Sequence, residues 1–516
     1  MLPTQRRVLG SPTRTLLKGA SRNVLRTSTQ LLSKTQYRSL TIKDLDSGKD
    51  QRERIVILGS GWAGYTLSRE LDHRQYQVVV VSPRSYFVFT PLLASCSVGT
   101  LEFRTALEPV RSRKGGTNYF QAWADGVDFA NKRIEIEEAV GDPTGAMALT
   151  TDRHAGESAE EREKRIAQDT KKGKVFSMTW DRLVVAVGCY SQTFGFEAAA
   201  LPTTSIEMRK MLLHFAVVGG GPTGIEFSAE LHDIIVEDLA KLYPDLMQYY
   251  KITVYDVAEK VLPMFDKKLG EYAMKTFRRE NIDIKTSHHV QELRKGAPSS
   301  VQDRGDFHEN EDCYTIRVKE EGEVGIGMCV WSTGLMMNPF VQKALGQPVN
   351  LPVDNVEITK GADKKDRPWL VKKHPRNGGI ITNDRLRVVL EPGKDVGEGR
   401  AVLKDVYAVG DCAVMEDTMY PATAQVANQK ARWLAKRLNK RDIDQNGFTY
   451  KNLGVMAYIG NWNAIMQSSG GDVSGRIAWF IWRGAYLAKA VSWRNKILIP
   501  TYWFINWIFG RDISRF

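Results

Sequence analysis

The sequence is poor in the residues that build metal centres and disulfide frameworks. Its 516 residues include five cysteines and eight histidines, with no Cys-x-x-Cys pair and no metal-ligand spacing among the histidines. Neither a zinc cluster nor a disulfide framework is predicted. Asp442 to Gly447 matches the opening of a calcium loop, but the twelfth position is Leu453 where that loop needs a bidentate glutamate. We therefore expect no bound metal. The cysteines, most simply buried thiols in a reducing compartment, are Cys96, Cys189, Cys313, Cys329 and Cys412.

Long apolar runs are also missing. The longest uncharged stretch near the C-terminus, 497–510, is shorter than the roughly 20 residues that a membrane-spanning helix needs. Residues 476–516 nevertheless hold many aromatic side chains, with arginine and lysine interleaved. This composition suits amphipathic helices that lie in the membrane interface. A dimer interface would also use such aromatics, and the two roles are compatible.

Acidic residues are absent from residues 1–42, which are rich in arginine, serine and threonine. That composition is typical of a mitochondrial transit peptide, with a disordered basic arm as the alternative. No apolar stretch long enough to stop import follows, which favours the matrix face of the inner membrane over the intermembrane-space face. The formal net charge of +12 is concentrated in this segment and in residues 476–516, so the body is near neutral. This distribution argues against a nucleic-acid partner.

What the sequence does have is two glycine motifs, each between a predicted strand and a predicted helix. Gly59, Gly61 and Gly64 follow the apolar strand 54–58 and precede a helical stretch over 65–71. The first glycine permits a tight turn, the second lets the backbone approach a pyrophosphate, and the third lets the helix pack on the strand. A single match would be weak, but strand, motif and helix occur in the required order.

The second motif, Gly219 to Gly224, follows the strand 214–218 in the same way. The next strand ends at Asp256, whose carboxylate can accept a hydrogen bond from a ribose 2′-hydroxyl and repels a 2′-phosphate. NADH is therefore favoured over NADPH, although a solvated acid at a strand end is the alternative. The first unit has no matching acid, and the Ser82 hydroxyl is the candidate partner for its ribose.

A third signal is the strand 406–409 followed by Gly410 and Asp411, which can place a carboxylate on the ribityl chain of FAD. Two glycine motifs and this strand, in this order, predict a flavoprotein that binds FAD and NADH. Strands that alternate with helical stretches predict parallel sheets. The expected fold class is α/β, with two Rossmann-like dinucleotide-binding domains and a C-terminal amphipathic helical membrane anchor.

Over most of residues 52–516 the chain resembles the type II, or alternative, NADH:ubiquinone oxidoreductases of mitochondria. The resembling stretches are 82–93, 212–227, 261–265, 331–334, 406–413, 421–427 and the aromatic C-terminus. The resemblance implies bound FAD, hydride transfer from NADH, and rotenone-insensitive reduction of ubiquinone at the membrane without proton pumping. It also implies a monotopic anchor and a homodimer. Relatives that reduce disulfides or oxidise sulfide need reactive cysteines, and Cys96 has no neighbour at usable spacing.

The resemblance also assigns residues. It implies that Glu226 lies near the nicotinamide and Gln425 near the flavin and the quinone head, although both residues are also ordinary polar positions near a helix start. The further FAD-binding candidates are Ser60, Trp62, Ala63, Thr90, Pro91, Gly188 and Ala424. The further NADH-binding candidates are Gly221, Pro222, Thr223, Thr333 and Gly334. The further quinone-site candidates are Asn428, Trp482 and Tyr486.

The predicted domains are a transit peptide over 1–42, an FAD-binding domain in two parts, an NADH-binding domain and a membrane-anchoring region. Their bounds are 52–195 with a polar surface insertion at 141–173, then 196–345, 346–447 and 448–516. After Gly195 the resemblance is interrupted, because the family carries a longer stretch with a helix before the NADH unit. The alternative functions are therefore a soluble FAD-dependent NADH diaphorase or oxidase, and a flavoprotein made inactive by this shortened segment.

Overall fold

The computed structural model describes residues 41–111, 116–139, 175–192, 206–302, 313–348, 355–360, 368–393 and 398–511. Most of the predicted transit peptide, the predicted insertion at 141–173 and the joint after Gly195 lie outside these residues. The chain divides into residues 1–50 and a large unit over 51–516. In the first unit, helix α2 (Ile42–Ser47) begins with a capping box between Thr41 and Asp44.

The centre of the largest sheet is built from four parallel strands in the order β2 (Tyr76–Ser82), β1 (Glu53–Leu58), β8 (Arg182–Val185) and β21 (Arg400–Ala408). Their nearly continuous apolar runs are buried, as expected for parallel strands covered on both faces. Helix α3 (Trp62–Glu70) follows β1 and packs against α13 (Ala424–Lys440). The return of the chain to this sheet at β21 was predicted from the sequence and is confirmed.

The other strands of this sheet extend it on both sides and carry none of the glycine motifs. They are β5 (Asn118–Asp128), β6 (Arg133–Glu138), β7 (Val175–Thr179), β17 (Val356–Lys360), β18 (Trp369–Val371), β19 (Ile380–Thr382), β20 (Arg387–Pro392) and β22 (Ala413–Met415). The large unit also contains several short elements: β3 (Tyr86–Val88), η1 (Thr90–Leu92), α4 (Leu93–Ser97), η2 (Phe103–Ala106), β4 (Leu107–Pro109), α12 (Pro339–Lys343) and η5 (Ala344–Gly346).

The second sheet has the order β12 (Ile282–Thr286), β11 (Lys251–Asp256), β10 (His214–Val218), β16 (Met328–Met337) and β9 (Cys189–Gln192). The first four strands are parallel, and β9 pairs antiparallel with β16, although the predicted boundary at residue 195 places β9 in the FAD unit. The helices of this unit are α7 (Ile206–Leu212), α8 (Pro222–Ile234), the π-turn η3 (Ile235–Leu239), α9 (Ala240–Leu242), η4 (Pro244–Leu246), α10 (Lys267–Arg279) and α11 (Ser299–Gln302). A smaller sheet joins β13 (Val290–Lys295), β14 (Tyr314–Val318) and β15 (Gly322–Ile326).

Helix α7 lies in the stretch after Gly195, where the resemblance to the family is interrupted. A helix does precede the NADH-side sheet, because α7 ends directly before β10 and buries Met208 and Leu212. A helix therefore stands directly before the NADH-side sheet, and the shortening of the stretch after Gly195 stays a prediction.

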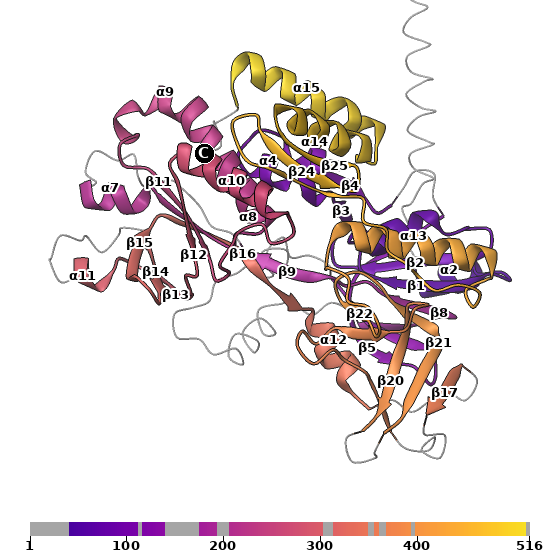
Figure 1. Cartoon of the computed structure of the whole chain (residues 1–516). Coiled ribbons are helices and arrows are strands. Elements are labelled where there is room, and N and C mark those ends of the chain that lie inside the picture. Colours follow the sequence, from indigo (N-terminus) through magenta and orange to yellow (C-terminus); the bar gives the residue numbers. More distant parts are fainter. Residues whose placement is uncertain are drawn as a thin grey trace, which may run out of the picture. The chain divides into compact units, whose positions relative to one another are not determined.

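The C-terminal region consists of a three-stranded sheet and two helices that lie side by side, drawn in orange to yellow in Figure 1. The elements are β23 (Val455–Tyr458), β24 (Ala464–Ser468), β25 (Gly471–Gly475), α14 (Arg476–Lys489) and α15 (Trp493–Phe509). Trp479 and Trp482 of α14 enter the core of the NADH-side unit. Ile499 of α15 packs in a cluster with Phe87 and Phe89 of the FAD-side unit. Within the described residues, no helix has the length and apolar character to cross a membrane.

Candidate active site

The first glycine motif has the geometry of a pyrophosphate-binding turn. Gly59 has a positive φ of 105°, and a Cβ there would overlap the backbone of Ala186. A Cβ on Gly64 would overlap the carbonyl oxygen of Gly59, so only glycine lets α3 lie this close to β1. A Cβ on Gly61 would meet nothing within 4 Å. The turn is therefore open at the one glycine that a pyrophosphate must approach.

The second motif repeats this arrangement. Gly219 has a φ of 119°, a Cβ on Gly224 would overlap the Gly219 carbonyl oxygen, and Gly221 faces open space. Gly61 and Gly221 are the N-caps of α3 and α8, and neither helix start has a side-chain cap. The first N–H groups of each helix thus keep their donors for an anion, which the helix dipole also favours. The residues present fit two dinucleotides.

Asp256 lies at the end of β11, beside the second motif. Its Oδ2 accepts a hydrogen bond from the Gly220 N–H, and its Oδ1 accepts one of 2.7 Å from the Ala258 N–H. These two bonds fix the carboxylate beside the turn while each oxygen keeps a lone pair for a further donor. The geometry suits the predicted ribose contact, which stays a prediction.

Ser82, the predicted ribose partner on the FAD side, already makes hydrogen bonds within the protein. The Ser82 hydroxyl is buried, lies 2.9 Å from the Ser60 hydroxyl, and accepts a hydrogen bond from the Arg84 N–H. Ser60 also donates to the backbone carbonyls of Arg84 and Tyr86. Both hydroxyls hold the segment after β2 against the first glycine turn.

Asp411 follows Gly410, which has a positive φ of 85°. Burial raises the pKa of Asp411, and Lys430 of α13 opposes that shift. Lys430 is only 2% exposed, and burial lowers its pKa to about 8. Sequence reasoning missed Lys430, since a lysine on a helix is usually solvated. Asp411 therefore sits beside a buried cation, at the edge of the sheet where the strands β1 and β21 end.

Glu226 connects helix α8 of the NADH-side sheet to the C-terminal region. It lies on α8, and its Oε1 accepts hydrogen bonds from the Tyr458 N–H at 3.1 Å and from the Trp482 Nε1 at 3.3 Å. Burial raises the pKa of Glu226 to about 8. The residue predicted for the nicotinamide thus contacts a residue predicted for the quinone. No sequence pattern signalled Tyr458.

A row of aromatic rings continues from Trp482 to the first glycine motif. Trp482 and Tyr486 make an edge contact with centroids 5.0 Å apart, and Tyr486 lies 6.4 Å from Phe89. Phe89 in turn lies 5.3 Å from Trp62, the first residue of α3, whose Nε1 donates to the Thr90 hydroxyl. Tyr486, predicted for the quinone site, therefore lies between Glu226 and the FAD-side turn.

Gln425 and Asn428 use their amides inside the protein. The Gln425 Oε1 accepts hydrogen bonds from the Tyr450 hydroxyl at 2.6 Å and the Leu453 N–H at 2.9 Å. Its Nε2 donates to the Gly454 carbonyl. The Asn428 Nδ2 donates to Thr66 of α3. Gln425 joins the start of α13 to the segment before β23, a role that the sequence did not suggest.

The other predicted residues lie at the edges of the two glycine turns. Ala63, Pro222, Thr223 and Ala424 open helices α3, α8 and α13. Gly188 follows β8 with a φ of 65°, and Thr333 and Gly334 lie in β16. Pro91 lies in η1. Sequence reasoning missed Ser332, whose hydroxyl donates to the carbonyls of Val218 and Gly219. Its position next to Thr333 could have indicated it.

Thiol chemistry finds little support at this site. The cysteines whose side chains the structure describes are not paired with one another. Burial raises the pKa of Cys96 to about 12 and that of Cys329 to about 12. Because the thiolate is the reactive form, these cysteines are poor nucleophiles at neutral pH.

Comparison with known proteins agrees with this geometry. The sequence model of the pyridine nucleotide-disulphide oxidoreductases matches residues 53–356, and that of the NDH2 C-terminal domain matches residues 452–512. A probable NADH dehydrogenase of Dictyostelium discoideum is 33% identical over 94% of this chain and 96% of its own length. An internal alternative NAD(P)H-ubiquinone oxidoreductase A1 of Solanum tuberosum mitochondria is 32% identical over 90% and 88%. The chain belongs to the type II, or alternative, NADH dehydrogenases.

Solved structures support the fold. The structure of NDH2 from Plasmodium falciparum in complex with NADH covers 89% of this chain and 99% of its own, with a TM-score of 0.65 and 21% identity. A sulfide:quinone oxidoreductase of Aquifex aeolicus covers 89% of this chain with a TM-score of 0.52 and 15% identity. At these identities the likeness concerns the fold.

Proposed function

We propose that this protein is a mitochondrial FAD-dependent NADH:ubiquinone oxidoreductase that pumps no protons. The observation that carries the proposal is the contact between Glu226 on the NADH side and Trp482 of α14, continued by Tyr486 toward the FAD-side turn. The two open glycine turns and the family membership support it further. Bound FAD supplies the hydride and electron chemistry, and the protein supplies position and polarity.

The residues of the two turns have separate tasks in this proposal. The first turn and Asp411 hold FAD, and the second turn and Asp256 hold NADH. Glu226 lies where the nicotinamide and the quinone approach, and burial raises its pKa to about 8. Gln425, Asn428, Trp482 and Tyr486 remain the proposed quinone contacts.

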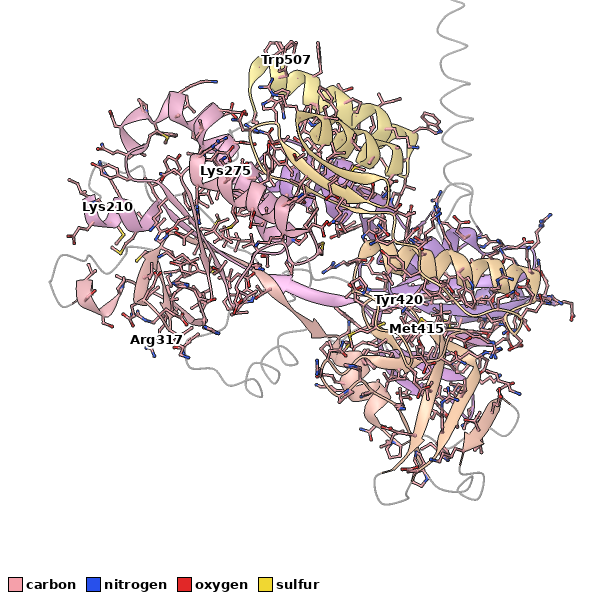
Figure 2. All side chains as sticks on the ribbon, in the orientation of Figure 1. Lys210, Lys275, Arg317, Met415, Tyr420 and Trp507 are labelled. Carbon is pink, nitrogen blue, oxygen red and sulfur yellow. The ribbon has the colours of Figure 1, made fainter. Side chains whose placement is uncertain are left out.

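A membrane surface is the proposed site of the reaction. The outward sides of α14 and α15 expose large apolar residues, among them Phe480 at 69% and Phe509 at 81%. Trp507 lies on the outer side of α15 in Figure 2 and belongs to the same exposed set. Arg476, Lys489 and Arg494 are exposed on these helices. We call this the aromatic face; its composition suits monotopic attachment to an anionic membrane surface.

The decisive experiment is an anaerobic reaction in two steps. The purified protein with FAD, in detergent, is first mixed with NADH, and the flavin absorbance is followed. A short-chain ubiquinone is then added, and re-oxidation is followed. Rapid bleaching and rapid return would support the proposal. Slow return with the quinone but fast return with oxygen would favour the soluble oxidase or diaphorase. An absorbance that NADH leaves unchanged would favour the inactive flavoprotein.

A homodimer and attachment to the matrix face are the finer parts of the proposal. Light scattering of the detergent-solubilised protein measures its oligomeric state, and a mass equal to one chain would contradict the homodimer. Protease treatment of mitochondria and of mitoplasts measures the second. Digestion in mitoplasts but not in intact mitochondria would place the protein on the intermembrane-space face.

A further inference from the structure

Lys430 of α13 differs from the other lysines of this protein because its side chain is buried. It is 2% exposed, and it is the one buried lysine within the described ranges of the chain. Lysine is almost never buried this completely unless its charge is paired. The buried arginines have such partners, since Arg54 donates to Gln77 and Arg387 donates to Asp444. The Lys430 ammonium donates no hydrogen bond to any described residue, so its burial needs an explanation.

Helix α13 places Lys430 beside the turn that follows β21. A Cβ on Gly410 would lie 3.4 Å from the Ala63 Cβ and 4.0 Å from the Ala427 Cβ, so the starts of α3 and α13 both pack against this turn. Lys430 follows Ala427 by three residues and therefore lies on the same side of α13. Asp411 is the next residue of the turn, and its carboxylate interacts electrostatically with Lys430. We call Asp411 and Lys430 the charge pair.

The proposed FAD site gathers negative charge. Bound FAD carries two negative charges on its pyrophosphate, and the carboxylate of Asp411 adds a third. The first glycine turn, 59–64, contains no basic residue. Burial raises the pKa of Asp411, and Lys430 is the group that opposes this shift. A cation beside the carboxylate therefore offsets both its desolvation and its repulsion from the pyrophosphate.

The charged groups of the neighbouring elements have partners of their own. On α3, Arg69 lies over the ring of Tyr65, and Glu70 pairs with Arg432 on the exposed side of α13. Cys412 also acts on the lysine of the charge pair, and its thiol donates to backbone carbonyls at 3.5 and 3.6 Å. In the part of the chain that the structure describes, the lysine is thus the one cation that acts on the carboxylate of the pair.

Resting on the proposed function, in which Asp411 helps to hold FAD, we propose that Lys430 is a positioning residue for this cofactor. Its ammonium offsets the charge of the Asp411 carboxylate and orients it, and the carboxylate accepts hydrogen bonds from the ribityl hydroxyls. Lys430 acts through Asp411 and needs no contact of its own with the flavin. Loss of the lysine charge should therefore weaken the retention of FAD.

This role makes the retention of FAD dependent on pH. Burial lowers the pKa of Lys430 to about 8, so its ammonium loses a proton as the pH rises through this value. The Asp411 carboxylate then faces the pyrophosphate without a cation beside it, and FAD is held less tightly. We expect the release of FAD from the wild-type holoprotein to accelerate as the pH is raised from about 7 to about 9.

The release of FAD tests this inference without turnover. The FAD-loaded protein is diluted, and free FAD is followed by its fluorescence at several pH values. Lys430→Met should release FAD at least tenfold faster at neutral pH and should lose the acceleration at alkaline pH. Lys430→Gln is a second neutral variant and should behave in the same way. Lys436→Met, at an exposed lysine of the same helix, is the control and should match wild type.

A comparison in the Asp411→Asn background separates this role from general support of α13. Because Lys430 acts through the Asp411 carboxylate, Lys430→Met should change FAD release less than twofold once that carboxylate is gone. Equal acceleration in both backgrounds would show that the lysine only supports the fold, and would overturn the inference. Wild-type release rates in both neutral variants, or an alkaline acceleration that persists in Lys430→Met, would also overturn it. Wild-type protein that retains no FAD would instead overturn the proposed function.

Discussion

Gln425 offers a test that separates a contact with the quinone from a structural role. Gln425→Leu keeps a similar volume but removes three hydrogen bonds, to Tyr450, Leu453 and Gly454. Each is worth about 0.5–1.5 kcal/mol net, and the site is only half-buried, so we expect a loss of about 1–3 kcal/mol in unfolding free energy. The same change should cost the quinone step about 1–3 kcal/mol, or roughly 5- to 150-fold in rate, if the amide faces the quinone.

Stopped-flow spectroscopy measures the two half-reactions of this variant separately. Reduction by NADH should stay within a few-fold of wild type, because the second glycine turn is untouched, and re-oxidation by ubiquinone should slow. Tyr450→Phe is the matched control, since it removes only the 2.6 Å hydroxyl contact to Gln425 and leaves the amide in place. Re-oxidation that slows equally in both variants would show that Gln425 acts by holding the segment 450–454. Equal slowing of both half-reactions in Gln425→Leu would make it a flavin-positioning residue.

The remaining predictions concern the coenzyme, FAD, the membrane and pH. Asp256→Ser should narrow the NADH/NADPH ratio of kcat/KM at least tenfold, about 1.4 kcal/mol, and an unchanged ratio would mean that another residue reads the ribose. Gly61→Ala should fold with a normal Tm but retain less FAD, whereas Gly64→Ala should lose both, as flavin absorbance and thermal unfolding will show. Phe480→Ser with Phe509→Ser should reduce sedimentation with anionic liposomes; full retention would contradict the aromatic face. Burial raises the pKa of Glu226 from 4.5 to about 8 in the folded state, so between these pH values the folded state binds one more proton than the unfolded state. The free energy of unfolding therefore decreases as pH rises through this range. Glu226→Gln should remove most of this pH dependence, as chemical denaturation at several pH values will measure.

The sequence predicted the parts of the fold that follow from local patterns. The strands β1, β10 and β21 and the two glycine turns were predicted because an apolar run, a glycine triplet and a helix leave few alternatives. The calcium-loop likeness was rejected on the missing glutamate. In the structure Asp442 and Asp444 instead pair with Arg437 and Arg387.

The sequence could not predict contacts between elements distant in the chain. Tyr458, Ser95 and Thr100 have no pattern of their own, and they matter because folding places them against α8. Gln425 was assigned from resemblance alone, and its bonds to the segment before β23 depend on where that segment returns. Glu226 looked like an ordinary acid near a helix start, and burial, to which the C-terminal region contributes, raises its pKa to about 8.

The C-terminal region packs into both cores and, in the proposed function, also attaches the protein to the membrane, which limits what its removal can show. The inner side of α14 places Trp479 and Trp482 in the NADH-side core, and α15 places Ile499 among FAD-side aromatics. Removal of both helices would expose these cores and take away the hydrogen bond from Trp482 to Glu226. A truncated chain that loses activity would then say nothing about the membrane. We therefore expect substitutions on the exposed aromatic face to test attachment while the inner contacts remain, because the exposed and the buried residues lie on different sides of these helices.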